Sequence, residues 1–245
     1  MYLHQKGGRR VKETVCITGA SRGLGYELTK LFYVHHYRVF PLVRSITAAE
    51  NLLNEMPNCH PIIADVAEDT CTDILKSALS AHTDVLDILI NNAGIPGIAY
   101  QITTVTTQET SALFNVHNLG VIRTVQATLS FLERSAKPRI INVSSRLASL
   151  TKTASGEFNE GGFSYSYRMA KAAQNMLTLC LDQELRSKGV HVSSVHPGKI
   201  NTNCASYDAN LEPNEAAKKV FDWCKTAGVH NSGSFVEPGM GGLPW

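Results

Sequence analysis

The sequence predicts a single α/β domain, a doubly wound and mostly parallel sheet of seven strands with helices on both faces. Short β-rich runs alternate with longer segments of helical pattern, each long enough for a crossover helix, so consecutive strands can run parallel. Several runs are almost continuously apolar, as strands buried on both faces require. No repeat, low-complexity tract or Pro/Ser-rich linker divides the chain. We therefore expect one domain over residues 11–245, preceded by a loose leader of residues 1–10.

Six of the seven expected strands can be assigned to runs in the sequence. In chain order they are ETVCITG (13–19), YRVFPLV (37–43), CHPIIAD (59–65), LDILINNAG (86–94), RIINVSS (139–145) and VHVSSVHPG (190–198). Ligands of open α/β sheets bind at the carboxyl ends of the strands. The segments that follow these runs are therefore the candidate site.

Charge and cysteine content exclude several classes of partner. With 23 Lys+Arg against 21 Asp+Glu, the net charge of +2 gives no electrostatic reason to expect nucleic acid or an anionic membrane. No run approaches 18 apolar residues, and no apolar segment follows the charged start of the chain. The six cysteines show no CxxC pair or zinc spacing, which favours reduced thiols and no metal. We expect a cytoplasmic protein.

The first strand leads into a glycine-rich turn, TGASRGLGYELTKLF, that is followed by a helix. Gly19, Gly23 and Gly25 allow positive φ angles and a close approach of the backbone, and the helix N-terminus offers free N–H groups to a pyrophosphate. Glycines are common in any turn, but the strand before and the helix after favour a dinucleotide site.

Two arginines indicate which dinucleotide is bound. Sites for NAD usually have an acidic residue after the second strand, whereas this strand ends VFPLVRS and places Arg44 there. Arg22 lies inside the glycine loop. Both can pair with a 2′-phosphate, although two ordinary surface arginines would look the same. The sequence favours NADP(H).

The segment YSYRMAK begins a helix that the pattern of Met169, Met176 and the following leucines predicts to run to Lys188-Gly189. Tyr167 and Lys171 are four residues apart and share a helix face, whereas Tyr165 and Lys171, six apart, do not. An ammonium beside a phenol favours the phenolate, so this pair can exchange a proton with a substrate oxygen near neutral pH. The same spacing also occurs on solvated helix faces.

Four motifs now stand in a fixed order: TGASRGLG, NNAG at 91–94, NVSS at 142–145, and Tyr167-x-x-x-Lys171. In this respect the chain resembles the short-chain dehydrogenase/reductase family over essentially its whole length, which implies a Rossmann-type fold. The long segment from residue 144 to the Tyr/Lys helix and the ending GSFVEPGMGGLPW look like those of the C-factor and sniffer-type carbonyl reductases.

The resemblance implies three catalytic roles. Tyr167 is the general acid/base, and Lys171 both lowers the pKa of the tyrosine and holds the nicotinamide ribose. Ser145 orients the substrate oxygen. Adjacent strand residues face opposite ways, so we expect Ser144 to point elsewhere and to be the serine that merely caps backbone groups.

The resemblance also implies the cofactor contacts. At the phosphates it places Thr18, Gly19, Ser21, Arg22, Gly23, Leu24 and Gly25. Arg44 is expected at the 2′-phosphate, Asp65 and Val66 at the adenine, and Asn91, Ala93 and Gly94 along the middle of the cofactor. In PGKINT, the residues expected at the carboxamide are Pro197, Gly198, Ile200 and Thr202. Asp65 could equally be a turn residue at the strand end.

One position departs from the family pattern. In FNVHNLGVI, His117 stands where the family usually has an asparagine that supports a water in the proton relay to the lysine, and Asn118 comes one residue later. Three hypotheses follow: His117 substitutes, Asn118 takes over through a local helix distortion, or the relay is weakened. A neutral imidazole can donate or accept a hydrogen bond, so the first is chemically reasonable. A histidine in that helix could equally be only packed.

We expect an NADP-dependent oxidoreductase that interconverts a ketone or aldehyde and its alcohol. A nucleotide-binding regulatory protein of low turnover, which His117 favours, and a biosynthetic epimerase, dehydratase or cyclase on the same scaffold are the alternatives. The substrate pocket is expected in the loops around Tyr100, Phe158, Phe163 and Tyr207, which could instead only pack. The family implies a homodimer or homotetramer through the helices at 113–131 and 169–185, whose apolar residues could also simply be buried.

Overall fold

The computed structural model describes residues 12–159, 162–201 and 209–245, and these form one sheet with helices on both sides. The strand order is β3-β2-β1-β4-β5-β6-β7-β8, parallel throughout except for the last pair. The strands are β1 Thr14–Thr18, β2 Arg38–Val43, β3 Ile62–Ile63, β4 Ile88–Asn91, β5 Arg139–Val143, β6 His191–Val195, β7 Ser234–Glu237 and β8 Gly241–Gly242. The predicted fold class is confirmed, but the described residues contain eight strands where we expected seven, because the two-residue β8 adds an antiparallel edge.

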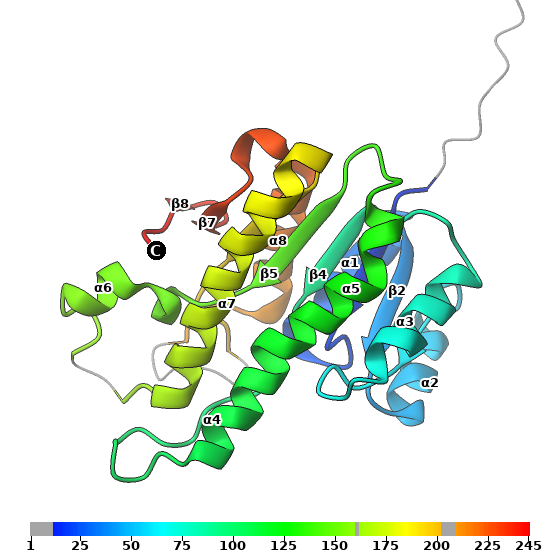
Figure 1. Cartoon of the computed structure of the whole chain (residues 1–245). Coiled ribbons are helices and arrows are strands. Elements are labelled where there is room, and N and C mark those ends of the chain that lie inside the picture. The colour runs from blue at the N-terminus through cyan, green and yellow to red at the C-terminus, as the bar shows by residue number, and fades with distance from the viewer. Residues whose placement is uncertain (1–11, 160–161, 202–208) are drawn as a thin grey trace, which may run out of the picture.

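Helices cover both faces of the sheet (Figure 1). On one face lie α1 Gly23–Val34, α2 Ile46–Glu55 and α8 Pro213–Thr226. On the other, turned towards the viewer in Figure 1, lie α3 Cys71–Ser80, α4 Thr107–Phe114, α5 Gly120–Leu132 and α7 Tyr165–Leu185. The short α6, Leu150–Ala154, lies in the long segment that joins β5 to α7.

Two apolar clusters, one on each side of the sheet, form the core. Along β1, Val15 and Ile17 belong to the cluster under α1 and α8, whereas Cys16 between them belongs to the cluster under α3 and α5. Neighbouring strand residues point to opposite faces, so a strand buried on both sides must be apolar at every position. Each large side chain buried in this way contributes about 1.5–3 kcal/mol.

The strand order places a topological switch point beside β1. From β1 the chain crosses to β2 and β3 on one side and to β4, β5, β6 and β7 on the other. The carboxyl ends of β1 and β4, at Thr18 and Asn91, therefore open a crevice between oppositely directed crossovers.

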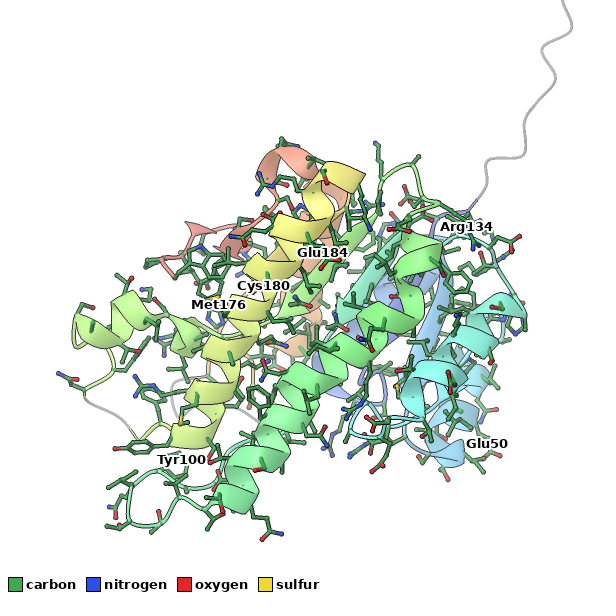
Figure 2. All side chains as sticks on the ribbon, in the orientation of Figure 1. Glu50, Tyr100, Arg134, Met176, Cys180 and Glu184 are labelled. Atoms are coloured by element: carbon green, nitrogen blue, oxygen red, sulfur yellow. The ribbon has the colours of Figure 1, made fainter. Side chains whose placement is uncertain are left out.

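The helix α7 buries a polar face and exposes both of its methionines. Met169 is 57% exposed and Met176 61%, and Figure 2 shows Met176, Cys180 and Glu184 along the outer side of the helix. Burial on the sheet therefore does not account for these methionines, and the homo-oligomer remains a prediction. The helix stops as expected, because Gly189 takes a left-handed φ of 80° after a 3-10 turn at Arg186–Lys188.

Within residues 12–159, 162–201 and 209–245, no helix is long and apolar enough to cross a membrane. These residues also contain no cluster of three or more His, Cys, Asp or Glu side chains that could hold a metal. The described cysteines are all free thiols, namely Cys16, Cys59, Cys71, Cys180 and Cys224.

Candidate active site

A cleft of about 470 Å³ lies at the carboxyl ends of the strands and gathers most of the predicted site residues. Its walls come from the glycine loop, the ends of β2, β4, β5 and β6, and α7. The predicted residues that line it are Gly19, Ser21, Arg22, Gly23, Leu24, Gly25, Arg44, Asp65, Val66, Ala93, Gly94, His117, Ser145, Tyr167, Lys171, Pro197, Gly198 and Ile200. A wider hollow of about 1330 Å³ near Thr14 and Arg38, at the amino ends of β1 and β2, contains none of them.

Two predicted residues do not line the cleft. The Thr18 hydroxyl accepts hydrogen bonds from the amides of Asn92 and Ala93, so it joins β1 to the loop after β4. Asn91 points into the core, where it bonds Asn142 and Thr124. The lining residue is its neighbour Asn92, because consecutive side chains at the strand end point in opposite directions. The predicted Thr202 lies outside the described residues.

The glycine loop has the backbone geometry that a dinucleotide requires. Gly19 and Gly23 take φ angles of +67° and +57°. A Cβ on Gly25 would lie 2.3 Å from the Gly19 carbonyl oxygen, so only glycine permits this turn. Arg22 is the N-cap of α1 but makes no side-chain cap, which leaves the first amide groups of the helix available to an anion.

Arg44 and Asp65 lie opposite each other at one end of the cleft. Arg44 Nη1 is 3.9 Å from Asp65 Oδ2, and the Arg44 side chain is largely exposed. Asp65 Oδ1 also accepts a hydrogen bond from the Ala67 amide at 2.9 Å. Asp65 therefore does form the strand-end turn that we considered, and it lines the cleft as well.

Tyr167 and Lys171 lie in the first turns of α7, whose N-cap Ser164 accepts the Tyr167 amide at 3.3 Å. Lys171 is only 4% exposed; its Nζ donates to the Val143 carbonyl oxygen at 2.7 Å and to Gln174 Oε1 at 3.0 Å. The same Nζ is 5.9 Å from the centre of the Tyr167 ring. Tyr165 is 43% exposed and does not line the cleft.

The two serines after β5 have different partners. The Ser145 hydroxyl lines the cleft and accepts a hydrogen bond from the Leu147 amide at 3.2 Å. The Ser144 hydroxyl donates to Asn175 Oδ1 on α7 at 2.7 Å. We expected Ser144 to be the backbone cap, but Ser145 is, because it begins the 3-10 turn Arg146–Ala148.

His117 lies in a π-helical turn, Asn115–Leu119, between α4 and α5. Its Nε2 is 2.9 Å from the carbonyl oxygen of Ile95 and 3.3 Å from the amide of the same residue. Burial, and then the nearby Lys171 ammonium, lower the pKa of His117 to about 3, so the ring is neutral at pH 7. The ring also meets that of Tyr167 edge to face, with centroids 5.6 Å apart.

The structure distinguishes between the hypotheses for this position. A local helix distortion exists, but it does not bring Asn118 to the cleft, because the Asn118 amide donates to the Ala170 carbonyl oxygen at 3.0 Å. His117 itself lines the cleft beside Tyr167 and Lys171.

Gln174 is a site residue that the sequence analysis missed. It connects Lys171 to the backbone of His117, since its Nε2 donates to the His117 carbonyl oxygen at 3.0 Å. The sequence feature that could have indicated Gln174 is a polar residue one helical turn after Lys171, on the same face of the helix.

The aromatic residues of the loops pack against their neighbours. Phe158 is buried against Phe163 and lies beneath the guanidinium groups of Arg146 and Arg168, at 5.5 and 5.7 Å. Tyr100 is exposed beside the start of α7 (Figure 2). None of the three described aromatics lines the cleft; Tyr207 is outside the described residues.

Fold and cleft together define a Rossmann-type dinucleotide-binding protein. A family model for short chain dehydrogenases matches residues 13–212. The C-signal protein of Myxococcus xanthus is 30% identical over 168 residues, which are 69% of this chain and 98% of that protein. The chain belongs to the short-chain dehydrogenase/reductase family.

Two solved structures extend this similarity to nearly the whole chain. The carbonyl reductase Sniffer of D. melanogaster is 26% identical, with a TM-score of 0.84 over 96% of this chain and all 100% of that one. The NADPH-bound carbonyl reductase from chicken fatty liver has a TM-score of 0.86 over 96% of this chain and 99% of that one, at 24% identity. The predicted resemblance to this family is thus confirmed.

Proposed function

We propose that this protein is an NADPH-dependent carbonyl reductase, or the corresponding alcohol dehydrogenase, acting on a small ketone or aldehyde. The observation that carries the proposal is that Ser145, Tyr167 and Lys171 line one cleft together with the glycine loop. Proton-transfer groups therefore face the place where a dinucleotide would lie. The fly and chicken proteins, which bear the name carbonyl reductase, support the same reaction class.

The residues present fit NADP(H). Close backbone contacts at Gly19 and Gly25 leave a cradle that any Cβ would disturb, and the uncapped start of α1 suits a pyrophosphate. Arg22 and Arg44 supply positive charge for the 2′-phosphate, and no acidic residue follows β2 in the NAD-specific position.

In this proposal Tyr167 gives its proton to the carbonyl oxygen of the substrate while Ser145 donates a hydrogen bond to the same oxygen. NADPH supplies the hydride when it is bound. Lys171 keeps an ammonium near the phenol and so stabilises the phenolate left behind. The protein thus orients the substrate and stabilises charge as it develops.

The test compares Tyr167→Phe with Tyr165→Phe, a matched change on the same helix outside the cleft. NADPH oxidation is followed with a panel of ketones, aldehydes and quinones, and NADH is run in parallel. We expect Tyr167→Phe to lose roughly 100-fold or more of kcat but to bind NADPH within a few-fold of the parent. Tyr165→Phe should keep full activity.

Turnover retained by Tyr167→Phe would refute the assigned role. Binding of NADPH without turnover by the parent chain would favour the regulatory alternative. Product formation without net NADPH oxidation would favour an epimerase, dehydratase or cyclase.

A further inference from the structure

Gln174 forms a fixed bridge between two groups of the site. On one side its Oε1 accepts from Lys171 Nζ at 3.0 Å, and on the other its Nε2 donates to the His117 carbonyl oxygen at 3.0 Å. The side chain is 1% exposed. Both ends of the amide are therefore satisfied, in the orientation that gives each a partner of the right kind.

The position of this bridge is informative. At the position of His117 the family pattern has an asparagine, which supports a water in the proton relay to the lysine. In this chain the Gln174 side chain connects the backbone of His117 directly to the Lys171 ammonium. A water between a carbonyl oxygen and an ammonium must donate to the first and accept from the second, and the Gln174 amide does both.

We propose that Gln174 replaces the relay water and acts as the positioning residue that holds Lys171 beside Tyr167. The proposal rests on the proposed function for its kinetic consequences, but the bridge itself is independent of the substrate. His117 takes part through its backbone oxygen, while its ring is held separately by Ile95.

The replacement changes how protons can move. A water can accept a proton on one side and release another on the opposite side, so a chain of waters conducts protons. A side-chain amide would have to be protonated on Oε1 and deprotonated on Nε2, which is unfavourable near neutral pH. The route from Lys171 through the His117 carbonyl is therefore closed, and Tyr167 is reprotonated from the cleft.

Two titratable groups lie close to Lys171. Tyr167 lies on the same helix, and His117, from the π-helical turn packed against α7, is neutral at pH 7 because burial lowers its pKa to about 3. The Lys171 ammonium also donates to the Val143 carbonyl oxygen at the end of β5.

Two substitutions separate positioning from packing. Gln174→Leu keeps most of the volume but has no polar atoms, so Lys171 and the His117 carbonyl lose a partner and water is shut out. We expect kcat to fall roughly 10- to 100-fold. Gln174→Ala opens space for a water that can make the same two bonds, and we expect kcat within about fivefold of the parent.

A packing role predicts the reverse order, because Leu fills the space and Ala leaves a cavity. If kcat of the Leu variant equals or exceeds that of the Ala variant, the proposal is wrong. Should Gln174→Leu not fold, Gln174→Met gives the same comparison. The matched control is Thr178→Val, a buried polar residue one turn along α7 that bonds Asn142 and Ser194; it should lower stability without changing the pH profile.

A second readout does not need turnover. Ultraviolet difference absorbance of the phenolate, with Tyr167→Phe subtracted to assign the signal, is followed as pH rises. In Gln174→Leu the ammonium is held less firmly, so the Tyr167 phenolate should appear about one pH unit higher than in the parent. An unchanged titration overturns the inference, even if the parent turns over no carbonyl; parent inactivity alone refutes only the proposed function.

Discussion

Lys171 shows how the site handles a charge that has been removed from water. An ammonium that is only 4% exposed is costly unless it finds acceptors. A backbone carbonyl at the end of β5 and the amide oxygen of Gln174 meet that need without adding a negative charge. A carboxylate there would oppose the phenolate form of Tyr167, whereas neutral acceptors leave the effect of the ammonium intact.

Arg44 gives a prediction about cofactor choice. If it binds the 2′-phosphate, Arg44→Ala removes a charge-assisted hydrogen bond at an exposed position and should weaken NADPH binding about 10-fold, with NADH binding nearly unchanged. Dissociation constants for both cofactors, measured by fluorescence titration, check this. Arg38→Ala at the other end of β2 is the matched control, since Arg38 bonds the His82 carbonyl oxygen far from the cleft. Equal losses for NADPH and NADH would contradict a phosphate-specific role.

At the residue scale the sequence predicted what depends on local spacing. Tyr167 and Lys171 are four apart on one helix, so helix geometry alone puts them on one face. Asn91 points into the core and the cleft-lining Asn92 was missed, because the direction of a side chain at a strand end depends on how β4 sits in the sheet. Gln174 could not be paired with His117, since 57 positions separate them and only the packing of α7 against the π-helical turn brings them together.

The start of α7 is fixed by a contact between two loops. Ser164, the N-cap of the helix, lies directly against Gly97, where a Cβ would be 1.9 Å from Oγ and 2.6 Å from Cβ of the serine. The same loop is tied to α7 by the bond from the Tyr165 amide to the Ala99 carbonyl oxygen. The position of Tyr167 therefore depends on a glycine 70 residues earlier in the chain.

Gly97→Ala should displace Ser164 and weaken the first turn of α7. Loss of the cap and local overpacking together should cost about 2–3 kcal/mol of unfolding free energy, and kcat should fall because Tyr167 is misplaced. Denaturant unfolding and steady-state kinetics measure the two effects. Gly162→Ala is the matched control, because its Cβ would be 3.5 Å from Tyr100, an ordinary contact. If the two variants behave alike, the contact at Ser164 does not position the helix.

Among the elements, the strands in apolar runs were predictable, even the two-residue β3, whereas α6 and β8 were not. The six assigned runs all contain strands, and most of these strands are buried on both faces and therefore apolar at nearly every position. The five-residue α6 and two-residue β8 are too short to produce a periodic signal. A local helix distortion at FNVHNLGVI was only one of three hypotheses, since nothing in these residues specifies a π-helical rather than an α-helical turn.

Among the buried histidines of the described residues, His117 and His191 have pKa values well below the ordinary value. Burial, opposed in part by the bond to the Gly228 carbonyl oxygen, lowers the pKa of His191 to about 4, and burial beside Lys171 lowers that of His117 to about 3. His117 lies beside the cleft, whereas His191 lies at the start of β6 and contacts Ser193. Both must be neutral in the folded protein, although each would accept a proton near pH 6.5 in the unfolded chain.

This difference predicts acid lability. Below about pH 6.5 the unfolded state binds more protons than the folded state. The stability that the two neutral rings contribute is therefore fully present above that pH and is lost as the pH falls towards the folded pKa values. Between pH 7 and pH 5 each of these histidines should lower the free energy of unfolding by about 2 kcal/mol. Most carboxylates are still ionised in this range, so they contribute little to the loss. Urea unfolding across this range measures the loss. His117→Asn should reduce the loss by about 2 kcal/mol, whereas His36→Asn, at an exposed position whose φ of 67° asparagine tolerates, should leave it unchanged. If the free energy of unfolding of the parent does not change between pH 7 and pH 5, both rings are protonated as easily in the folded protein as in the unfolded chain. His117 is then not held neutral beside Lys171.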